Sequence, residues 1–146
     1  MNAFATFLAV IAGLAGSVQV AIMARLGERV GVFAALAWAT ILTALLAVGM
    51  LLVAKQSVGG IAAAARQPVW LWTGALLSLL IVFTITYSGS RLGIVATVAI
   101  LIAGQLFMGA VIDRFGLFGA DRLGLAWPRV LGIALLAAGA ALTLKR

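Results

Sequence analysis

Four long stretches of this chain contain no charged side chain, and they limit what the chain can fold into. They cover residues 3–24, 30–54, 67–90 and 92–112. Each is at least as long as the roughly 20 apolar residues that cross a bilayer as a helix. A soluble domain would need charge over its surface, yet 66% of the residues are hydrophobic and only 9% are charged. We therefore predict an all-α integral membrane protein.

A fifth apolar stretch follows Arg129 and is shorter than the others. Pro128 suits a first helical turn, and the Arg129 side chain can reach out of the membrane, so the helix is predicted to cover residues 125–144. The sequence thus predicts five transmembrane helices in a single membrane domain over residues 1–146. The short alternating segments of a membrane barrel are not seen.

The connections between these helices differ in length. Residues 25–29 and 88–91 are predicted to be tight turns. The longer connection after residue 54 should hold a short interfacial helix, because Ala62–Ala65 favours one. Gly116 and Gly119 are expected to adopt left-handed turns that end the fourth helix.

Charge and composition exclude several classes of function. The net charge is +7, but the Lys and Arg residues lie singly or in pairs between apolar runs, which is typical of contacts with lipid headgroups and not of nucleic-acid binding. The chain has no cysteine and no histidine, and its three carboxylates, Glu28, Asp113 and Asp121, lie at helix boundaries. We therefore expect no catalytic set, no metal site and no cofactor. A phosphate-binding loop of the Walker type is also missing, so ATP is not expected to drive the protein directly.

Two glutamines within the predicted helices, Gln19 and Gln105, are the main candidates for a binding site. An amide in hydrocarbon costs several kcal/mol unless it has a hydrogen-bond partner. That partner is either a substrate or a neighbouring helix, in which case the amide only holds helices together. Helical spacing places Gly16 and Met23 on the face of Gln19, and Gly109 on the face of Gln105.

Trp38 and Thr84 are further candidates for contact with substrate. Trp38 lies deep in the second helix, where its ring can stack on an aromatic or cationic substrate or contact lipid. Thr84 belongs to a weakly polar stripe on the third helix, whose hydroxyls can also bond back to their own helix.

Asp113 and Arg114 end the fourth predicted helix. The helix dipole disfavours a negative charge at a C-terminus, so Arg114 or another arginine should compensate Asp113. We expect this pair of charges to anchor the loop in a structural or gating role. Its place at the level of the headgroups favours that role over proton coupling.

Small residues on the last helix predict a dimerisation surface. Gly132 and Gly139 are two turns apart, and Ala134 and Ala138 are one turn apart, which permits close approach of another backbone. The alternative is that these residues pack against the chain's own third helix.

Several blocks of the sequence resemble the YdcZ-type five-helix branch of the drug/metabolite transporter superfamily. The most specific is the ordered pair "AGQ" and "DRFGLFG", and the resemblance covers nearly the whole chain. The blocks are "QVAIMARLG" (19–27), "PVWLWTGALLS" (68–78), "SGSRLG" (88–93), "AGQL" (103–106), "DRFGLFG" (113–119) and "RVLGIALLAAG" (129–139).

The resemblance implies an exporter of small molecules in the inner membrane that acts as a pair of five-helix halves. The chain departs from the family pattern at Met23, where the family usually has Asn, and at Ala75 and Ser78, where glycines are usual. The change at Met23 removes an amide from the expected cavity.

The distribution of basic residues predicts an antiparallel, inverted dimer. Five spans place equal numbers of Lys and Arg on the two faces, so the bias that normally fixes orientation is missing. One face holds Lys55, Arg66, Arg114, Arg122 and Arg129, and the other holds Arg25, Arg29, Arg91, Lys145 and Arg146.

Depth supports the same arrangement. Gln19 is expected about 7 Å and Gln105 about 10 Å inside the ends of their helices. These ends lie on opposite faces, so inverting one copy brings the Gln19 of one protomer level with the Gln105 of the other.

Together these features predict a secondary transporter, an exporter that uses alternating access and has a small-molecule substrate. Its partner is either an identical chain or a paralogue. Two alternatives remain: a non-transporting membrane interaction protein, and a proton-coupled exporter of hydrophobic cations like the small multidrug transporters. The second alternative lacks the mid-membrane carboxylate that it would need.

Overall fold

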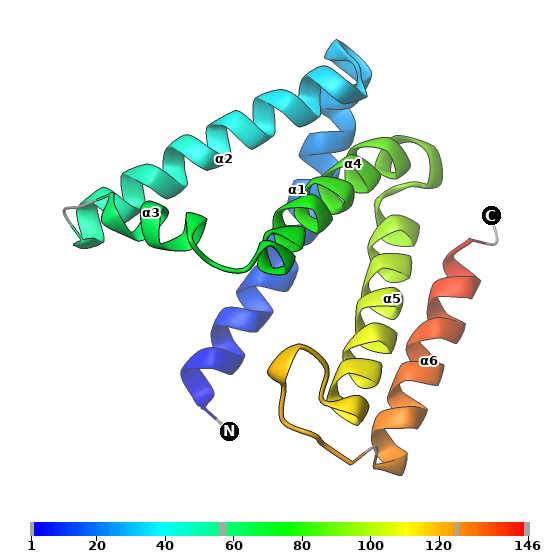
Figure 1. The fold of residues 1–146 in the computed structure, drawn as a ribbon. Helices are drawn as coiled ribbons and strands as arrows, with labels where there is room; N and C mark the ends of the chain where they lie inside the picture. The colour runs from blue at the N-terminus through cyan, green and yellow to red at the C-terminus, as the bar shows by residue number, and fades with distance from the viewer. Residues whose placement is uncertain (1, 56–57, 125, 145–146) are drawn as a thin grey trace. The chain divides into compact units, whose positions relative to one another are not determined.

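The computed structural model describes residues 2–55, 58–124 and 126–144, and within these ranges the chain forms helices and connecting loops without any strand (Figure 1). The all-α prediction is confirmed. Two predictions include residues that lie outside the described ranges. The predicted fifth helix includes Leu125, and the count of basic residues includes Lys145 and Arg146. The elements in order are α1 (Ala3–Val30), α2 (Val32–Lys55), α3 (Gly59–Ala65), the 3-10 turn η1 (Val69–Trp72), α4 (Thr73–Leu92), α5 (Ile94–Phe115), the 3-10 turn η2 (Leu117–Gly119) and α6 (Trp127–Thr143).

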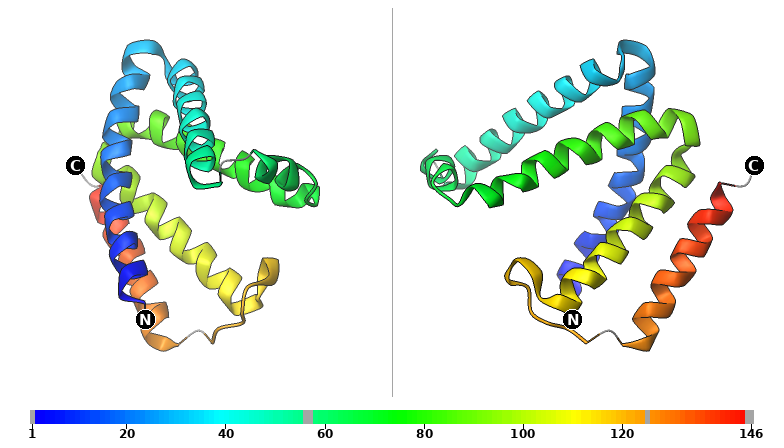
Figure 2. Two further views of the ribbon diagram at one scale, coloured as in Figure 1. Left: turned by 90° about the vertical axis from the view of Figure 1, so that its left-hand side faces the viewer. Right: turned by 45° about the vertical axis from the view of Figure 1, so that its right-hand side comes forward.

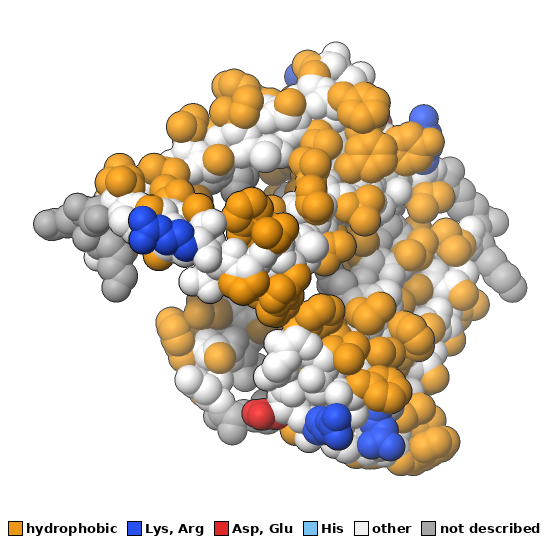
Figure 3. Space-filling model, in the orientation of Figure 1, with side chains coloured by type: hydrophobic (Ala, Val, Ile, Leu, Met, Phe, Trp, Pro, Cys, Tyr) orange, Lys and Arg blue, Asp and Glu red, His pale blue; other side chains and the backbone are white. Residues whose placement is uncertain are grey.

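Among the described residues, four helical segments are long and apolar enough to cross a membrane. They are Ala3–Val30, Val32–Ala54, Val69–Leu92 and Ile94–Phe115, whereas α6 has 17 residues. At most 17% of the most apolar window of any of the four is buried within the chain. Hydrophobic side chains are accordingly spread over the whole face in Figure 3, and charged side chains appear only as small patches. This surface suits a hydrocarbon solvent, in which backbone polar groups are satisfied inside helices.

The two short connections are single glycines, so the predicted tight turns at residues 25–29 and 88–91 are wrong. α1 continues through these charged residues to Val30, and Arg25 and Glu28 pair on its surface, with 2.9 Å between Nη1 and Oε2. The helix breaks only at Gly31, with φ 88°, and α4 likewise continues to Leu92 and breaks at Gly93, with φ 84°. Left-handed backbone of this kind costs a residue with a Cβ atom about 1–2 kcal/mol, which explains glycine at both breaks.

The longer connections contain the predicted local structure. The short helix expected after residue 54 is present as α3. Gly116 ends α5 in the left-handed conformation, with φ 64°, and its N–H donates to the carbonyl of Ile112 at 2.8 Å. Gly119 is also left-handed, with φ 82°.

The helices form two compact units, residues 1–21 with 91–146 and residues 22–90. In the first unit α5 and α6 pack side by side and antiparallel, joined by the loop that contains η2 (Figures 1 and 2). The single domain over residues 1–146 stays a prediction.

The second unit is held together where the end of α1 meets the end of α4. Thr86 of α4 is fully buried, and its hydroxyl donates to the carbonyl of Val82 at 2.7 Å, so no polar group is left unpaired there. A Cβ atom built on Gly27 would lie 2.7 Å from Cγ2 of Thr86. An aromatic contact joins α2 to α4. The ring centroids of Phe33 and Phe83 are 5.8 Å apart.

We expect Gly27→Ala to destabilise the protein by about 1–3 kcal/mol, because the added methyl overpacks the contact with Thr86. Thr86→Ser removes the Cγ2 methyl and should recover part of that loss in the double variant. The measurement is the thermal unfolding midpoint of the purified protein in detergent.

Gly49→Ala is the matched control, since Gly49 lies within α2 and an added Cβ meets nothing within 4 Å. This change should be neutral or stabilise by about 0.5–1 kcal/mol. A Gly27→Ala variant that unfolds at the wild-type temperature would contradict the close packing of α1 against α4.

Candidate functional site

Both candidate glutamines lie near the middle of their helices. α5 has 22 residues, or about 33 Å, and Gln105 is about 15 Å from either end. Gln19 is about 4 Å from the middle of α1. The predicted depths of about 7 and 10 Å are therefore wrong, because both helices continue beyond the charged residues that were taken as their ends. Secondary transporters typically bind substrate near the middle of the membrane.

Neither amide is satisfied within the part of the chain that the structure describes. The side chains of Gln19 and Gln105 are exposed, and neither has a hydrogen-bond partner among the described residues. Gly16 and Gly109 are half-buried, and a Cβ atom on either would meet nothing within 4 Å. Each amide therefore has open space beside it for a ligand or for another chain.

A groove of about 410 Å³ lies among α1, α5 and α6 in the first unit. It is lined mainly by apolar side chains, including Val98, Ile102 and Leu136, together with Ser17 of α1. Gln105 lies three residues after Ile102 and so continues the same face of α5. Gln19 lies about 200° around α1 from Ser17, at about 100° per residue, and faces away from this groove. Within one chain, the groove therefore adjoins only one of the two amides.

The remaining candidates, Met23, Trp38 and Thr84, lie in the second unit. Met23 is buried, at 5% exposure, whereas Trp38 is 60% exposed and open to ligand or lipid. The Thr84 hydroxyl donates to the carbonyl of Leu80 at 2.8 Å. This is the alternative stated for the polar stripe, in which its hydroxyls bond back to their own helix. Their roles in binding stay predictions.

The charges at the end of α5 form a bridge to α6. Oδ2 of Asp113 lies 2.9 Å from Nη1 of Arg129, and the carbonyl of Asp113 accepts the N–H of Leu123 at 2.9 Å. The expectation that an arginine compensates Asp113 is confirmed, and the arginine is Arg129. Asp113 and Arg129 are far apart in sequence, but they flank the loop of one helical hairpin. That placement is the sequence signal that could have predicted their ion pair. The interaction closes the loop at its base.

The small residues of α6 lie on two sides of the helix. Gly139 lines the groove among α1, α5 and α6, whereas Ala134 lines a second groove on the opposite side of the α5–α6 contact. By helical spacing Gly132 lies with Gly139, and Ala138 lies with Ala134. The helix that packs against α6 is α5. The dimerisation surface stays a prediction.

Sequence reasoning missed two buried threonines, Thr86 and Thr97. Thr97 is 2% exposed, and its hydroxyl donates to the carbonyl of Gly93 at 2.8 Å, which satisfies the first carbonyl after the break between α4 and α5. A threonine four residues after a helix-breaking glycine was the signal that could have revealed it.

A family model described as "Putative inner membrane exporter, YdcZ" matches residues 4–142. The chain belongs to this family. No curated protein and no solved structure matches it. Membership confirms the resemblance seen in the sequence motifs and identifies a multi-pass protein of the inner membrane. It supports an exporter with a small-molecule substrate, and not an enzyme.

We expect the Asp113–Arg129 interaction to contribute only about 0.2–1 kcal/mol, because its side chains are 31% and 45% exposed and remain partly hydrated. A double-mutant cycle of Asp113→Asn and Arg129→Gln, read by unfolding of the purified protein, should give a coupling energy in that range that falls at high salt. The cycle of Asp113→Asn with Arg114→Gln is the control and should be additive. Additive effects in the first cycle would refute the ion pair.

Proposed function

We propose that this exporter is a secondary transporter that works as an inverted dimer by alternating access, with Gln19 and Gln105 lining the substrate path. The observation that carries the proposal is the pair of mid-helix amides without a partner among the described residues. An unsatisfied amide in hydrocarbon costs several kcal/mol. A substrate or a second copy of the chain removes that cost by supplying hydrogen bonds.

The α6 helix supplies the fifth span in this proposal. It starts beside the end of α5, where Arg129 meets Asp113, and returns antiparallel along α5. Its 17 residues are at the lower limit of a membrane span, at about 26 Å. Arg129, in its first turn, can reach the headgroups along its aliphatic stem.

An odd number of spans favours a dimer of two copies in opposite orientation. The termini then lie on opposite faces, and two copies of opposite orientation give the inverted repeats that alternating access commonly uses. The balance of Lys and Arg between the faces leaves both orientations open to the chain. Because Gln19 and Gln105 lie near the middle of their helices, inversion is expected to keep all four amides of a dimer at similar depth.

The substrate in this proposal is neutral, zwitterionic or amphipathic. Glu28 and Asp113 lie in the last turns of α1 and α5, and Asp121 lies in the loop before α6. A hydrophobic cation exchanged for protons normally needs a carboxylate in the membrane, so the small-multidrug mechanism has less support.

The experiment compares the Gln19→Leu and Gln105→Leu variants with the wild type for release of metabolites and survival of biocides in cells. Leu keeps a similar volume but removes the amide, so each variant should lose about 5- to 100-fold in transport, the effect of one to a few kcal/mol. The amount of folded protein in the membrane should not change.

Gln67→Leu is the matched control, because Gln67 lies just after α3 and its side-chain amide donates to the carbonyl of Ala63 at the exposed end of that helix. It should transport like the wild type. Normal transport by the double Gln19→Leu, Gln105→Leu variant would refute the site. Loss of folded protein in the two single variants would instead favour the non-transporting interaction protein, in which the amides hold helices together.

A further inference from the structure

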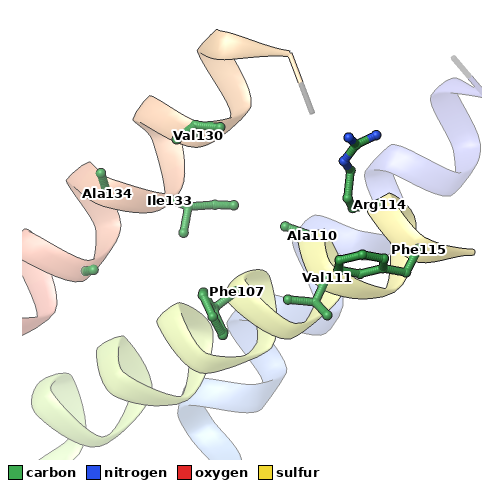
Figure 4. Close-up of a pocket in the computed structure, with 9 residues that line it drawn as sticks. Phe107, Ala110, Val111, Arg114, Phe115, Val130, Ile133 and Ala134 are labelled. Atoms are coloured by element: carbon green, nitrogen blue, oxygen red, sulfur yellow. The ribbon is translucent and has the colours of Figure 1, made fainter. Parts of the chain in front are cut away.

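The second groove of the first unit, between α5 and α6, has one charged residue, Arg114, at its edge. Its volume is about 420 Å³, and its lining is apolar, with Arg114 contributing the aliphatic part of its side chain. Figure 4 shows Ile133 of α6 pointing toward α5, with Phe107 and Arg114 along the α5 side. We call it the α5–α6 groove.

Arg114 has no ion-pair partner in the part of the chain that the structure describes. It is exposed, and the neighbouring carboxylate of Asp113 is already bound to Arg129 at 2.9 Å. A positive charge without a counter-ion therefore lies beside an apolar groove. This combination fits a ligand with an anionic head and a hydrocarbon tail.

The depth of the groove matches a lipid. α5 is about 33 Å long and the hydrocarbon core is about 30 Å thick, so Arg114, one residue from its end, lies at the level of the headgroups. Phe107 lies about 10 Å deeper along the helix. The negative dipole end of α5 opposes an anion here, but the positive end of α6 lies at the same level and offsets it.

We propose that the α5–α6 groove binds an anionic phospholipid, with the phosphate on Arg114 and the upper part of an acyl chain against Phe107 and Ile133.

A second copy of the chain fits this groove less well, since it would have to bring a carboxylate to Arg114. Two of the three carboxylates are engaged, Glu28 by Arg25 and Asp113 by Arg129. The bilayer around a multi-pass inner-membrane protein supplies the lipid directly. This site does not depend on the proposed transport mechanism.

The test measures the thermal midpoint of the full-length protein in detergent as phosphatidylglycerol or phosphatidylcholine is added. A ligand that binds only the folded state raises the midpoint by mass action. Phosphatidylglycerol should act at about fivefold lower concentration than phosphatidylcholine, the contribution of one arginine near an anionic headgroup. Arg114→Gln should lose this preference, and Arg114→Lys, which keeps the charge, should retain it.

Two further variants make the result specific. Arg66→Gln, at the exposed end of α3, should keep the preference for phosphatidylglycerol. Ala137→Phe, which fills the α5–α6 groove without changing its charge, should weaken binding of both lipids. Three outcomes would overturn the proposal: an unchanged preference in Arg114→Gln, equal stabilisation by glycerol phosphate without a tail, or loss of a dimer in Ala137→Phe, which would make the groove a contact between chains.

Discussion

A polar group within the hydrocarbon core has no water to bind, so it needs a partner from the protein, a ligand or another chain. The backbone meets this requirement inside helices. Side-chain hydroxyls meet it locally: those of Thr40, Thr84 and Thr86 each donate to the carbonyl four residues earlier. No buried side-chain oxygen or nitrogen lacks a partner in the described ranges. Against that background, the open amides of Gln19 and Gln105 are two mid-helix groups for which the described part of one chain supplies no partner.

The same requirement explains how the helices are joined. A long loop inside a membrane would expose unpaired backbone, and the chain avoids this at Gly31 and Gly93, where one left-handed residue separates two helices. The carbonyl of Gly93 accepts bonds from both the N–H and the hydroxyl of Thr97. The longer loop after α5 instead closes at its base through Asp113 and Arg129. Charged groups thus occur where helices end and water or headgroups can reach them.

Much of this fold was predictable from the sequence, because a run of about 20 uncharged residues has few alternatives to a membrane helix. The α3 helix and the left-handed Gly116 were also predictable from local residue preferences. Helix ends were not, since an Arg25–Glu28 pair can extend a helix as easily as a lone charge can end a span. That error placed Gln19 and Gln105 too near the ends of their helices. The partner of Asp113 and the division of the α6 small residues between two grooves depend on how α6 packs on α5, which no local pattern encodes.

The proposed working exporter consists of two copies of opposite orientation, so both orientations must occur in the membrane. The most direct measurement uses the lack of cysteine in the chain: Asn2→Cys is labelled on intact cells with a membrane-impermeant thiol reagent, then again after the membrane is made permeable. Because Lys and Arg are balanced between the faces, we expect roughly half of the protein to be labelled at first and the rest only after permeabilisation. Complete labelling, or none, on intact cells would mean a single orientation and would contradict an antiparallel homodimer.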